Sequence, residues 1–405
     1  MHVKFIIRIK MLSQQTIETV QSTIPLLAEH GHTITENFYE KLFKAHPELK
    51  NIFNMNNQQN GNQSRALADA VFAYANNITN LEALIPAVQK IAHKHTSLGV
   101  KPEHYPIVGK YLLEAIQDVL DLPKDHPALV AWAEAYGQLA DVFINTEEGL
   151  YKANEELDGG WRGFREFVIE DIVIETPEVK SFYLRPKDNG RLPLYKGGQY
   201  IGIKVNPEDS EFEQIRQYSL SGIPGDTQLR ITIKSEVNGL VSNQIHQSAK
   251  GTELLVQAPA GVFNLDPQAK KHILIAGGVG ITPVLSMLYE ALGQGIAPEN
   301  VLFIQCQRDK QHQICKDELA LLHKVNGFRY KTNYMDGEGG DNKGYLNASI
   351  LTKWLSDDKF DIDGDTAVYF CGPKPFMSAL NKCCIDLGFE ESNIHYESFG
   401  PNAAL

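Results

Sequence analysis

The chain has 405 residues and a formal net charge of −12 at pH 7, and because this length exceeds what one hydrophobic core usually supports, we expect two or three domains. The acidic balance argues against nonspecific nucleic-acid binding, which requires a basic surface, and no stretch of membrane-spanning length is free of charges and glycines. The five cysteines lie in the last quarter, are odd in number and form no Cys-x-x-Cys pair, so we expect a soluble protein of the cytoplasm without structural disulfides.

The first ten residues are basic and include a short apolar run at residues 5–7. They lack the full apolar segment and the small-residue cleavage site of a secretion signal, so we do not expect secretion. A cleaner amphipathic pattern begins at Met11. We therefore interpret residues 1–10 as an extension or as a segment that precedes an alternative start.

The first part of the chain is poor in glycine, since residues 1–150 contain six of the 32 glycines. Apolar residues recur there at three- and four-residue spacing, which is typical of amphipathic helices. The pattern predicts helices over residues 12–29, 32–43, 64–77, 81–94, 105–120 and 127–151. A helical domain with helices of uneven length often packs around a cofactor.

Two histidines compete as metal ligands in this helical part. His93 and His95 are two residues apart, so on one helix they cannot face the same pocket, and composition alone promotes neither. Gln63 and Leu67 are four residues apart and share a helix face, where they offer a hydrogen-bonding group and an apolar wall. An ordinary helix flank is the alternative interpretation of that pair.

The period of the pattern changes after a polar segment at residues 152–161, which we predict to be a hinge between domains. Short alternating segments separated by Pro, Gly and Asp follow it, and they predict a small antiparallel β-barrel. The predicted strands cover residues 164–170, 181–185, 199–205, 215–220, 228–233 and 253–257.

One barrel segment, residues 213–220, suits a flavin. Alternation along a strand points Arg216 and Tyr218 to the same side, where they offer a cation to a phosphate and a flat ring to a planar ligand, whereas Ser219 points to the other side. A half-exposed strand with a surface arginine is the alternative. Residues 239–242 then open a helix whose backbone N–H groups and Ser242 hydroxyl could hold a pyrophosphate, with a structural cap as the alternative.

Strands and helices alternate from His272 onward, which predicts a parallel sheet with crossover helices. A buried strand at residues 273–276 runs into the glycine-rich segment 277–283, where the backbone can approach a ligand closely. Thr282 can cap the following helix and Pro283 suits its first turn. The segment departs from the Gly-x-Gly-x-x-Gly fingerprint because proline replaces the last glycine.

Taken together, these motifs resemble those of the bacterial flavohaemoglobin (flavohemoprotein) family. The resemblance runs from residue 11 to residue 405, and it rests on residues 37–39, 52–55, 63–67, 94–97, 101–105, 142–145, 198–200, 216–219, 277–283, 369–373 and 396–401. It implies an all-α globin domain (11–151), the hinge (152–161), an antiparallel FAD-binding barrel (162–268) and an α/β parallel-sheet NAD(P)H-binding domain (269–405).

The resemblance also implies roles for individual residues around a haem b. It assigns His95 as the iron ligand, which leaves His93 without a role. The other residues that it assigns to the haem pocket are Tyr39, Gln63 and Leu67 on the distal side, Phe53 as the aromatic that wedges the haem, Tyr105 and Glu147 beside the histidine, and Lys94 facing the reductase. In the family, hydrogen bonding beside the histidine raises its electron donation to iron.

Further residues are implied to bind the two other cofactors. Those implied for FAD are Tyr200, Arg216, Gln217, Tyr218, Ser219 and Ser242. Those implied for the nicotinamide nucleotide are Gly278, Val279, Gly280, Ile281, Thr282, Pro283, Cys371, Gly372 and Pro373. Five residues of the terminal aromatic segment are also implied to bind cofactor: Glu397, Ser398, Phe399, Gly400 and Pro401. Phe399 is expected to cover the flavin until nicotinamide displaces it, with packing in a buried strand as the alternative. Arg308 could meet the 2′-phosphate of NADPH, but a surface arginine and a preference for NADH are our expectation.

The activity that the resemblance implies is nitric oxide dioxygenation. Hydride passes from NAD(P)H to FAD, single electrons pass to the haem iron, and bound O2 reacts with nitric oxide to give nitrate. Two alternatives remain open: a gas sensor or oxygen-binding protein, and an NAD(P)H-dependent reductase of a ferric complex, a quinone or a lipid peroxide. No effector domain is visible, which weakens the sensor. We expect a monomer with no nucleic-acid partner and no membrane insertion.

Overall fold

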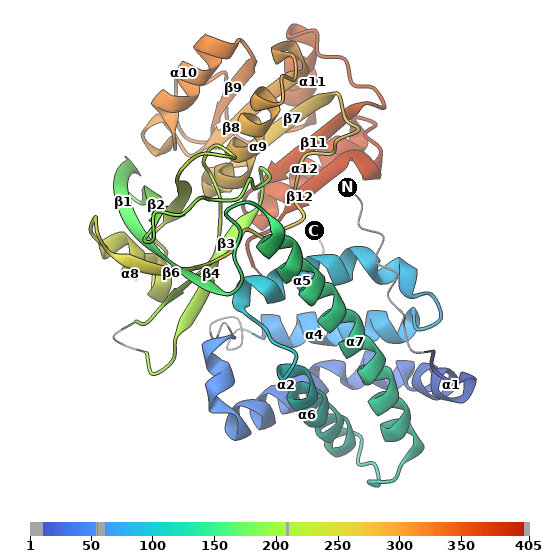
Figure 1. The fold of residues 1–405 in the computed structure, drawn as a ribbon. Coiled ribbons are helices and arrows are strands. Elements are labelled where there is room, and N and C mark those ends of the chain that lie inside the picture. The colour runs from blue at the N-terminus through green and yellow to red at the C-terminus, as the bar shows by residue number, and fades with distance from the viewer. Residues whose placement is uncertain (1–10, 54, 56–60, 208–209, 401–405) are drawn as a thin grey trace. The chain divides into compact units, whose positions relative to one another are not determined.

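A computed structural model describes residues 11–53, 55, 61–207 and 210–400 of the protein. The chain divides into two compact units, the first built mainly from residues up to Glu156 and the second mainly from residues after it. The first unit is helical and the second contains two β-sheets (Figure 1). None of the helices in the described ranges combines the length and apolarity needed to cross a bilayer.

The helical unit confirms the α-helical character predicted for this part of the chain. Its elements are α1 (Gln14–Ser22), α2 (Ile24–Ala45), η1 (Pro47–Asn51), α4 (Asn62–Asn76), η2 (Leu81–Leu84), α5 (Ile85–Leu98), α6 (His104–Val119) and α7 (Pro127–Glu156). Most of them pack around one core that contains Phe38, Leu42, Ile116 and Trp132, none more than 3% exposed.

The boundary between the first two helices differs from the prediction. The sequence predicts one helix over residues 12–29 and a break before residue 32, but the chain breaks at Thr23 and α2 continues through Gly31. Pro25 lies in the first turn of α2, where its missing N–H costs nothing, although it would interrupt α1 if that helix continued. Gly31 stays helical and lies opposite Ala68 of α4.

The segment predicted to be a hinge is helical in its first half. Helix α7 extends to Glu156 because residues 152–156 contain neither glycine nor proline and are mostly good helix formers. The chain then reaches Gly159, whose φ of +76° no helix would accept. The helix therefore ends inside residues 152–161.

The first sheet of the second unit is antiparallel, as predicted. Its strands are β1 (Phe164–Thr176), β2 (Val179–Pro186), β3 (Tyr200–Val205), β4 (Gln214–Ser219), β5 (Leu229–Lys234) and β6 (Glu253–Gln257), in the order β4-β3-β6-β1-β2-β5, with α8 (Leu240–Gln247) between β5 and β6. Strand β1 is six residues longer than the predicted segment because a register shift between Ile169 and Asp171 interrupts the alternation there.

The second sheet is parallel, also as predicted, and helices cover both of its faces (Figure 1). Its strand order is β10-β9-β8-β7-β11-β12. The elements are β7 (Lys271–Gly277), η3 (Gly278–Gly280), α9 (Ile281–Gly293), η4 (Pro298–Asn300), β8 (Val301–Gln307), η5 (Lys310–His312), α10 (Lys316–Asn326), β9 (Arg329–Tyr334), β10 (Asn342–Lys343), α11 (Ala348–Asp357), β11 (Thr366–Cys371), α12 (Lys374–Asp386), η6 (Glu391–Asn393) and β12 (Ile394–Glu397). Helices α9 and α10 share one core with the sheet, and α11 and α12 share another.

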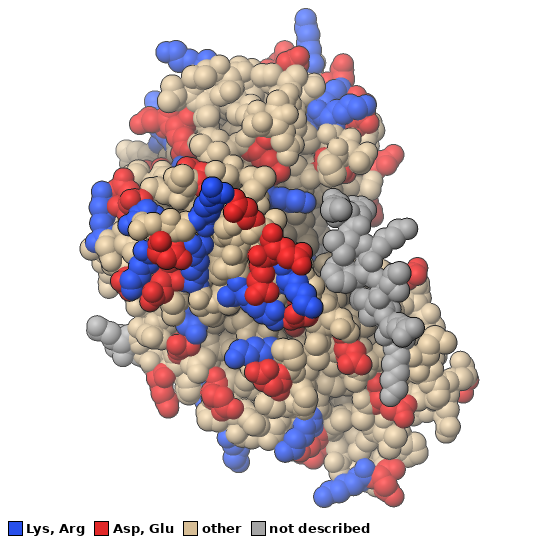
Figure 2. Space-filling model, viewed as in Figure 1, with Lys and Arg blue, Asp and Glu red and all other residues tan. Residues whose placement is uncertain are grey.

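The surface carries charges of both signs. On the face that Figure 2 shows, basic and acidic side chains of the described residues are interspersed. The net charge of −12 over the sequence does not favour nonspecific binding to nucleic acid.

Strand β7 contains an unusual buried histidine. His272 is 1% exposed, and neither ring nitrogen has a hydrogen-bond partner among the described residues. Burial lowers the pKa of His272 to about 4, although the charge of Asp266 acts in the opposite direction. Between pH 6.5 and 4 the unfolded chain therefore binds a proton that the folded chain does not.

We predict that His272→Phe reduces the acid sensitivity of the second unit. Above about pH 6.5 the imidazole is neutral in both the folded and the unfolded chain, and stability is highest. As pH falls toward 4 only the unfolded chain takes up the proton, so the free energy of unfolding decreases. From pH 7 to pH 4.5 the parent should lose roughly 2–3 kcal/mol of unfolding free energy more than the variant. Calorimetric unfolding of both proteins at the two pH values measures this difference, and parallel pH dependences would contradict the prediction.

Candidate functional site

A histidine, a tyrosine and a carboxylate meet where α5, α6 and α7 approach one another. His95 Nδ1 lies 2.7 Å from Oε1 of Glu147 and 3.1 Å from the hydroxyl of Tyr105. The Tyr105 hydroxyl donates to the same Glu147 oxygen at 2.5 Å. Because the carboxylate accepts from Nδ1–H, it fixes the tautomer of the imidazole and leaves Nε2 with the lone pair that a metal requires.

Packing holds this group rigidly. Glu147 is 3% exposed and Tyr105 is 8% exposed, and the Tyr136 hydroxyl of α7 donates to the Tyr105 carbonyl at 2.7 Å. The ring of Phe143 lies 5.6 Å from the His95 ring. Burial and then the charge of Glu147 raise the pKa of Tyr105, so its phenol remains a proton donor at neutral pH.

The structure distinguishes the two histidines that the sequence left in competition. It is His95 that joins the Glu147 and Tyr105 pair. The signal for the carboxylate was weak, because Glu147 is 52 residues from His95 and one of many glutamates on helices. Lys94 lies beside His95 on α5 and is partly exposed, and its role toward the reductase stays a prediction.

The residues predicted for the distal side also come together. Tyr39 of α2 is 6% exposed, and the Phe53 ring meets the Tyr39 ring edge-on at 5.8 Å. Burial raises the pKa of Tyr39, although a hydrogen bond with Gln63 acts in the opposite direction. Leu67, one turn after Gln63 on α4, packs against the same core. Tyr39 is therefore a protonated hydroxyl in largely apolar surroundings.

These two clusters fit the haem that the resemblance implies. His95 Nδ1 is occupied by Glu147, while no described residue hydrogen-bonds Nε2. Phe53 and Leu67 are apolar and yet only partly buried, which suits side chains that contact a planar apolar group. His95 would hold the iron through Nε2, and Phe53, Leu67 and Tyr39 would line the pocket.

The predicted flavin segment forms strand β4. Arg216, Gln217 and Tyr218 are all partly exposed, and Ser219 is buried. Burial therefore does not alternate over residues 216–218, although Ser219 differs from Tyr218 as predicted. Arg216 Nη1 donates to the carbonyl of Ile215 at 2.9 Å, so the guanidinium is held along its own strand.

Tyr200 and Ser242 are also predicted to bind the flavin, and they have different surroundings. Tyr200 begins β3 and pairs with Ala260. A Cβ on Gly261 would lie 3.0 Å from the Tyr200 ring, so the glycine makes room for that ring, a role that local sequence did not reveal. The Ser242 hydroxyl accepts from the N–H of Glu236 at 3.3 Å. Gly239 is the N-cap of α8 and no side chain caps the helix, so Ser242 does not form the structural cap considered as the alternative.

The two predicted nicotinamide motifs meet at the carboxyl ends of neighbouring strands. Cys371 at the end of β11 pairs with Ala276 of β7 on one side and with Glu397 of β12 on the other. A Cβ on Gly280 would lie 2.3 Å from the Cys371 carbonyl oxygen, so only glycine allows this approach. The carboxyl edge of a parallel sheet is where such folds bind nucleotides.

Side chains in the first of these motifs serve the core. Ile281 is 0% exposed and Thr282 is 2% exposed, so neither residue is accessible to a nucleotide, whereas Gly278 and Val279 are half-buried. Gly280 is the N-cap of α9, and the Thr282 hydroxyl donates to the Val279 carbonyl at 3.1 Å. The prediction that Thr282 caps the helix is therefore wrong, because Gly278–Gly280 form a 3₁₀ turn that starts the helix earlier. Pro283 lies in the first turn as predicted.

The second motif is split between the core and a helix start. Cys371 is 0% exposed, so its side chain cannot reach a nucleotide. Gly372 approaches Gly277, with its added Cβ 3.1 Å from the Gly277 Cα. Pro373 is the N-cap of α12.

The end of the chain is less buried than a core strand would be. Strand β12 ends at Glu397, and Phe399 is 52% exposed, which weighs against the packing alternative. Ser398 follows the strand and Gly400 has a φ of +144°, while Pro401 lies outside the described residues.

The arginine considered for the 2′-phosphate of NADPH lies on the surface. Arg308 follows β8, is 61% exposed and has its Nε 3.8 Å from a carboxylate oxygen of Asp336. A carboxylate beside the guanidinium disfavours a phosphate there. The geometry thus agrees with the expected surface arginine.

Comparisons with known proteins cover nearly the whole chain. The family model "Globin" matches residues 36–143, and the model "Oxidoreductase NAD-binding domain" matches residues 274–382. The chain is 42% identical to a flavohemoprotein of Bacillus subtilis (strain 168), covering 98% of this chain and 99% of the relative. It is also 42% identical to a flavohemoprotein of Rhizobium meliloti (strain 1021), covering 97% and 99%.

Two solved structures with related names are also similar to this chain. The flavohemoglobin from Malassezia yamatoensis with bound FAD and heme is 29% identical with a TM-score of 0.83, covering 96% of this chain and 100% of that one. The FAD/NAD binding domain of a nitric oxide dioxygenase from Vibrio cholerae O1 is 32% identical with a TM-score of 0.53, covering 59% and 100%.

We predict that His95→Ala removes most of the haem and leaves the flavin content unchanged. The only ring nitrogen placed to bind iron in this cluster is lost, whereas the barrel residues are untouched. Haem and flavin are quantified by absorbance after extraction, with His93→Ala as the matched control on the same helix. Full haem content in His95→Ala, or equal loss in His93→Ala, would show that the ligand is misassigned.

Proposed function

The chain belongs to the flavohemoprotein family, an NAD(P)H-dependent oxidoreductase with haem and FAD, and from that premise we propose that it is a nitric oxide dioxygenase. Two molecules of nitric oxide and two of O2 take two electrons from one NAD(P)H and give two nitrate ions, NAD(P)+ and one proton. When bound, the FAD accepts the electron pair and releases single electrons, and the haem iron supplies the centre at which O2 is activated. A similar structure carries the name nitric oxide dioxygenase, which supports this reaction.

The observation that carries the proposal is the Glu147 carboxylate at 2.7 Å from His95 Nδ1. A carboxylate that draws on the N–H gives the imidazole anionic character and raises its electron donation through Nε2. Reversible gas binding does not need that donation, whereas oxygen activation does. Glu147 is 3% exposed, so the carboxylate end of the interaction is shielded from water.

The other proximal residue keeps this carboxylate in place. Tyr105 donates to the same oxygen, Oε1, that lies nearest His95. A buried carboxylate is costly unless its oxygens are hydrogen-bonded. The phenol therefore offsets part of the cost of burial and fixes the direction in which the carboxylate accepts.

On the distal side, Tyr39 offers a hydroxyl to a negatively polarised ligand in the pocket. Its raised pKa keeps the proton on the phenol, and its hydrogen bond with Gln63 orients the side chain. A hydrogen bond to developing negative charge in such a dry pocket contributes roughly 1.5–3 kcal/mol. Phe53 and Leu67 add apolar surface to the same side.

We propose NADH as the preferred electron donor. The residue closest in type to a 2′-phosphate ligand, Arg308, has Asp336 beside it. That carboxylate would repel the additional phosphate of NADPH.

The reaction is tested by its stoichiometry. Purified protein is reduced with NADH without oxygen, then given O2 and measured amounts of nitric oxide, and NADH and nitrate are quantified. We expect one nitrate per nitric oxide and half as much NADH consumed. NADH oxidation without nitrate formation would instead indicate a reductase of other acceptors.

We also predict that Glu147→Gln keeps the haem but slows nitrate formation by about tenfold or more. The amide retains the shape and an acceptor for the His95 N–H but removes the negative charge. Glu148→Gln, the neighbouring and more exposed glutamate of α7, is the matched control. If nitrate forms at the parent rate in Glu147→Gln, the proximal carboxylate is only structural.

A further inference from the structure

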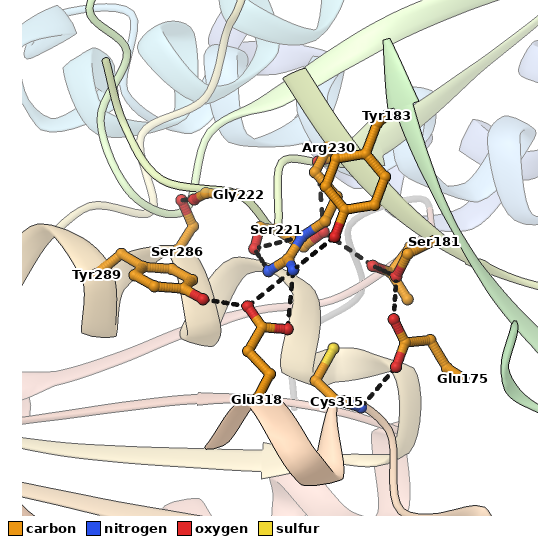
Figure 3. A network of polar contacts seen from close by, with 11 residues as sticks. Glu175, Ser181, Tyr183, Ser221, Gly222, Arg230, Ser286, Tyr289, Cys315 and Glu318 are labelled. Carbon is orange, nitrogen blue, oxygen red and sulfur yellow. Dashed lines mark hydrogen bonds and ion pairs between the residues drawn. The ribbon is translucent and has the colours of Figure 1, made fainter. Parts of the chain in front are cut away.

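Within the second unit, a buried polar network joins the antiparallel sheet to helices α9 and α10 (Figure 3). At its centre is Arg230 of β5, which is 5% exposed. Its Nη1 donates to both carboxylate oxygens of Glu318 on α10 at 2.8 Å. The two residues lie 88 positions apart in the sequence, so the pair connects the predicted FAD-binding barrel with the nucleotide-binding fold.

The same arginine holds the chain that follows the predicted flavin strand. Arg230 donates through Nε to the Ser221 carbonyl at 3.1 Å, and Nη2 donates to that oxygen as well. Ser221 lies two residues beyond the end of β4. One guanidinium therefore contacts both the end of the flavin segment and a helix of the nucleotide-binding fold.

A second arm of the network reaches the beginning of the same helix. Glu175 of β1 accepts from the backbone N–H of Cys315 at 3.0 Å and from the Ser181 hydroxyl at 2.6 Å. Cys315 is the N-cap of α10, in the left-handed conformation at a φ of 52°. A carboxylate at a helix N-terminus is favoured by the helix dipole.

A chain of hydroxyl groups closes the two arms into one network. Ser181 Oγ lies 2.8 Å from Thr232 Oγ1, which lies 2.9 Å from Ser221 Oγ. Both arms end on the first turn of α10, one at Cys315 and the other at Glu318. The barrel thus contacts the first turn of α10 at two points, which fixes the orientation of the helix as well as its position.

Helix α9, which follows the glycine turn for the nucleotide, is tied to the barrel as well. The Ser286 hydroxyl donates to the Gly222 carbonyl at 2.9 Å, and Tyr289 donates to Glu318. The N–H of Gly197 donates to Glu290 at 2.6 Å, and a Cβ on Gly197 would lie 2.7 Å from the Met287 backbone. The barrel loop and α9 are thus in direct backbone contact.

The energetics of such a pair point to geometry rather than to stability. Arg230 is buried, whereas the Glu318 side chain is 26% exposed. An ion pair with one buried member often adds little net stability, since desolvation offsets the attraction, but it is directional and breaking it leaves the buried charge unpaired. Hydride transfer is sensitive to distance, because reacting atoms must be held near contact. A rigid directional pair between the two cofactor-binding folds suits that requirement.

We propose that Arg230 and Glu318 are positioning residues that hold the flavin strand and the nucleotide turn in register for hydride transfer. In that step the nicotinamide C–H bond breaks, its electron pair and hydrogen pass to the flavin, a proton is taken up, and NAD(P)+ leaves. The proposal rests on the NAD(P)H-dependent reductase function of the family and not on nitric oxide dioxygenation. It can therefore fail or stand independently of the haem reaction.

The test compares Glu318→Ala and Glu318→Gln with the parent, with Asp317→Ala as the matched control on the same turn of α10, where the side chain is exposed. Flavin reduction by NADH is followed by anaerobic stopped-flow absorbance over a range of NADH concentrations. Glu318→Ala should lower the rate at saturating NADH by about tenfold or more while flavin content stays at the parent level. Glu318→Gln, which keeps the shape and one acceptor, should fall between them.

Two further readouts separate positioning from a general structural role. Reoxidation of the reduced flavin by ferricyanide, which needs no nicotinamide, should match the parent. Hydrogen exchange at the backbone of residues 219–222 and 313–318 should increase in both Glu318 variants and not in Asp317→Ala. An unchanged saturating rate in Glu318→Ala would overturn the proposal, and so would loss of flavin in both Glu318 variants, since the pair would then serve folding.

Discussion

The hydrogen bond between Glu147 and His95 is the interaction on which the helical unit depends. A carboxylate that is 3% exposed needs partners, and in this structure they come from α5 and α6, through His95 and Tyr105. Satisfying that one group brings three helices together at one point. The same bond sets the tautomer of His95. The contact that satisfies the buried carboxylate therefore also leaves Nε2 of His95 free of a proton, as iron binding requires.

In the second unit, close backbone contacts and one arginine join the elements that are predicted to bind the cofactors. Gly280 lets the turn after β7 approach the carbonyl of Cys371, and Gly197 lets a barrel loop approach α9. Arg230 then joins the barrel to α10 through Glu318. Close backbone packing supplies rigidity and the ion pair supplies direction, which are the two properties required to transfer electrons between bound cofactors.

Much of the fold and of the candidate site could be predicted from the sequence, because local patterns of residues determine it. Three- and four-residue periodicity located the helices, alternation located the strands, and the flavohaemoglobin motifs placed Tyr39, Gln63 and His95. The features that could not be predicted depend on a nearby residue in the chain or on tertiary contacts. Pro25 moved a helix boundary, a register shift near Ile169 hid half of β1, and a 3₁₀ turn moved the cap of α9 to Gly280. Arg230 and Glu318 carried no signal at all, since each looks like an ordinary surface charge until the fold buries Arg230 and pairs it with the half-buried Glu318.

The central claim is that Glu147 makes His95 a strong electron donor, and the iron–histidine stretching frequency tests it most directly. Resonance Raman spectra of the ferrous protein report that frequency, which rises with the anionic character of the imidazole. We expect a clear downshift in Glu147→Gln relative to the parent, and none in Glu148→Gln. The same frequency in all three proteins would contradict the account.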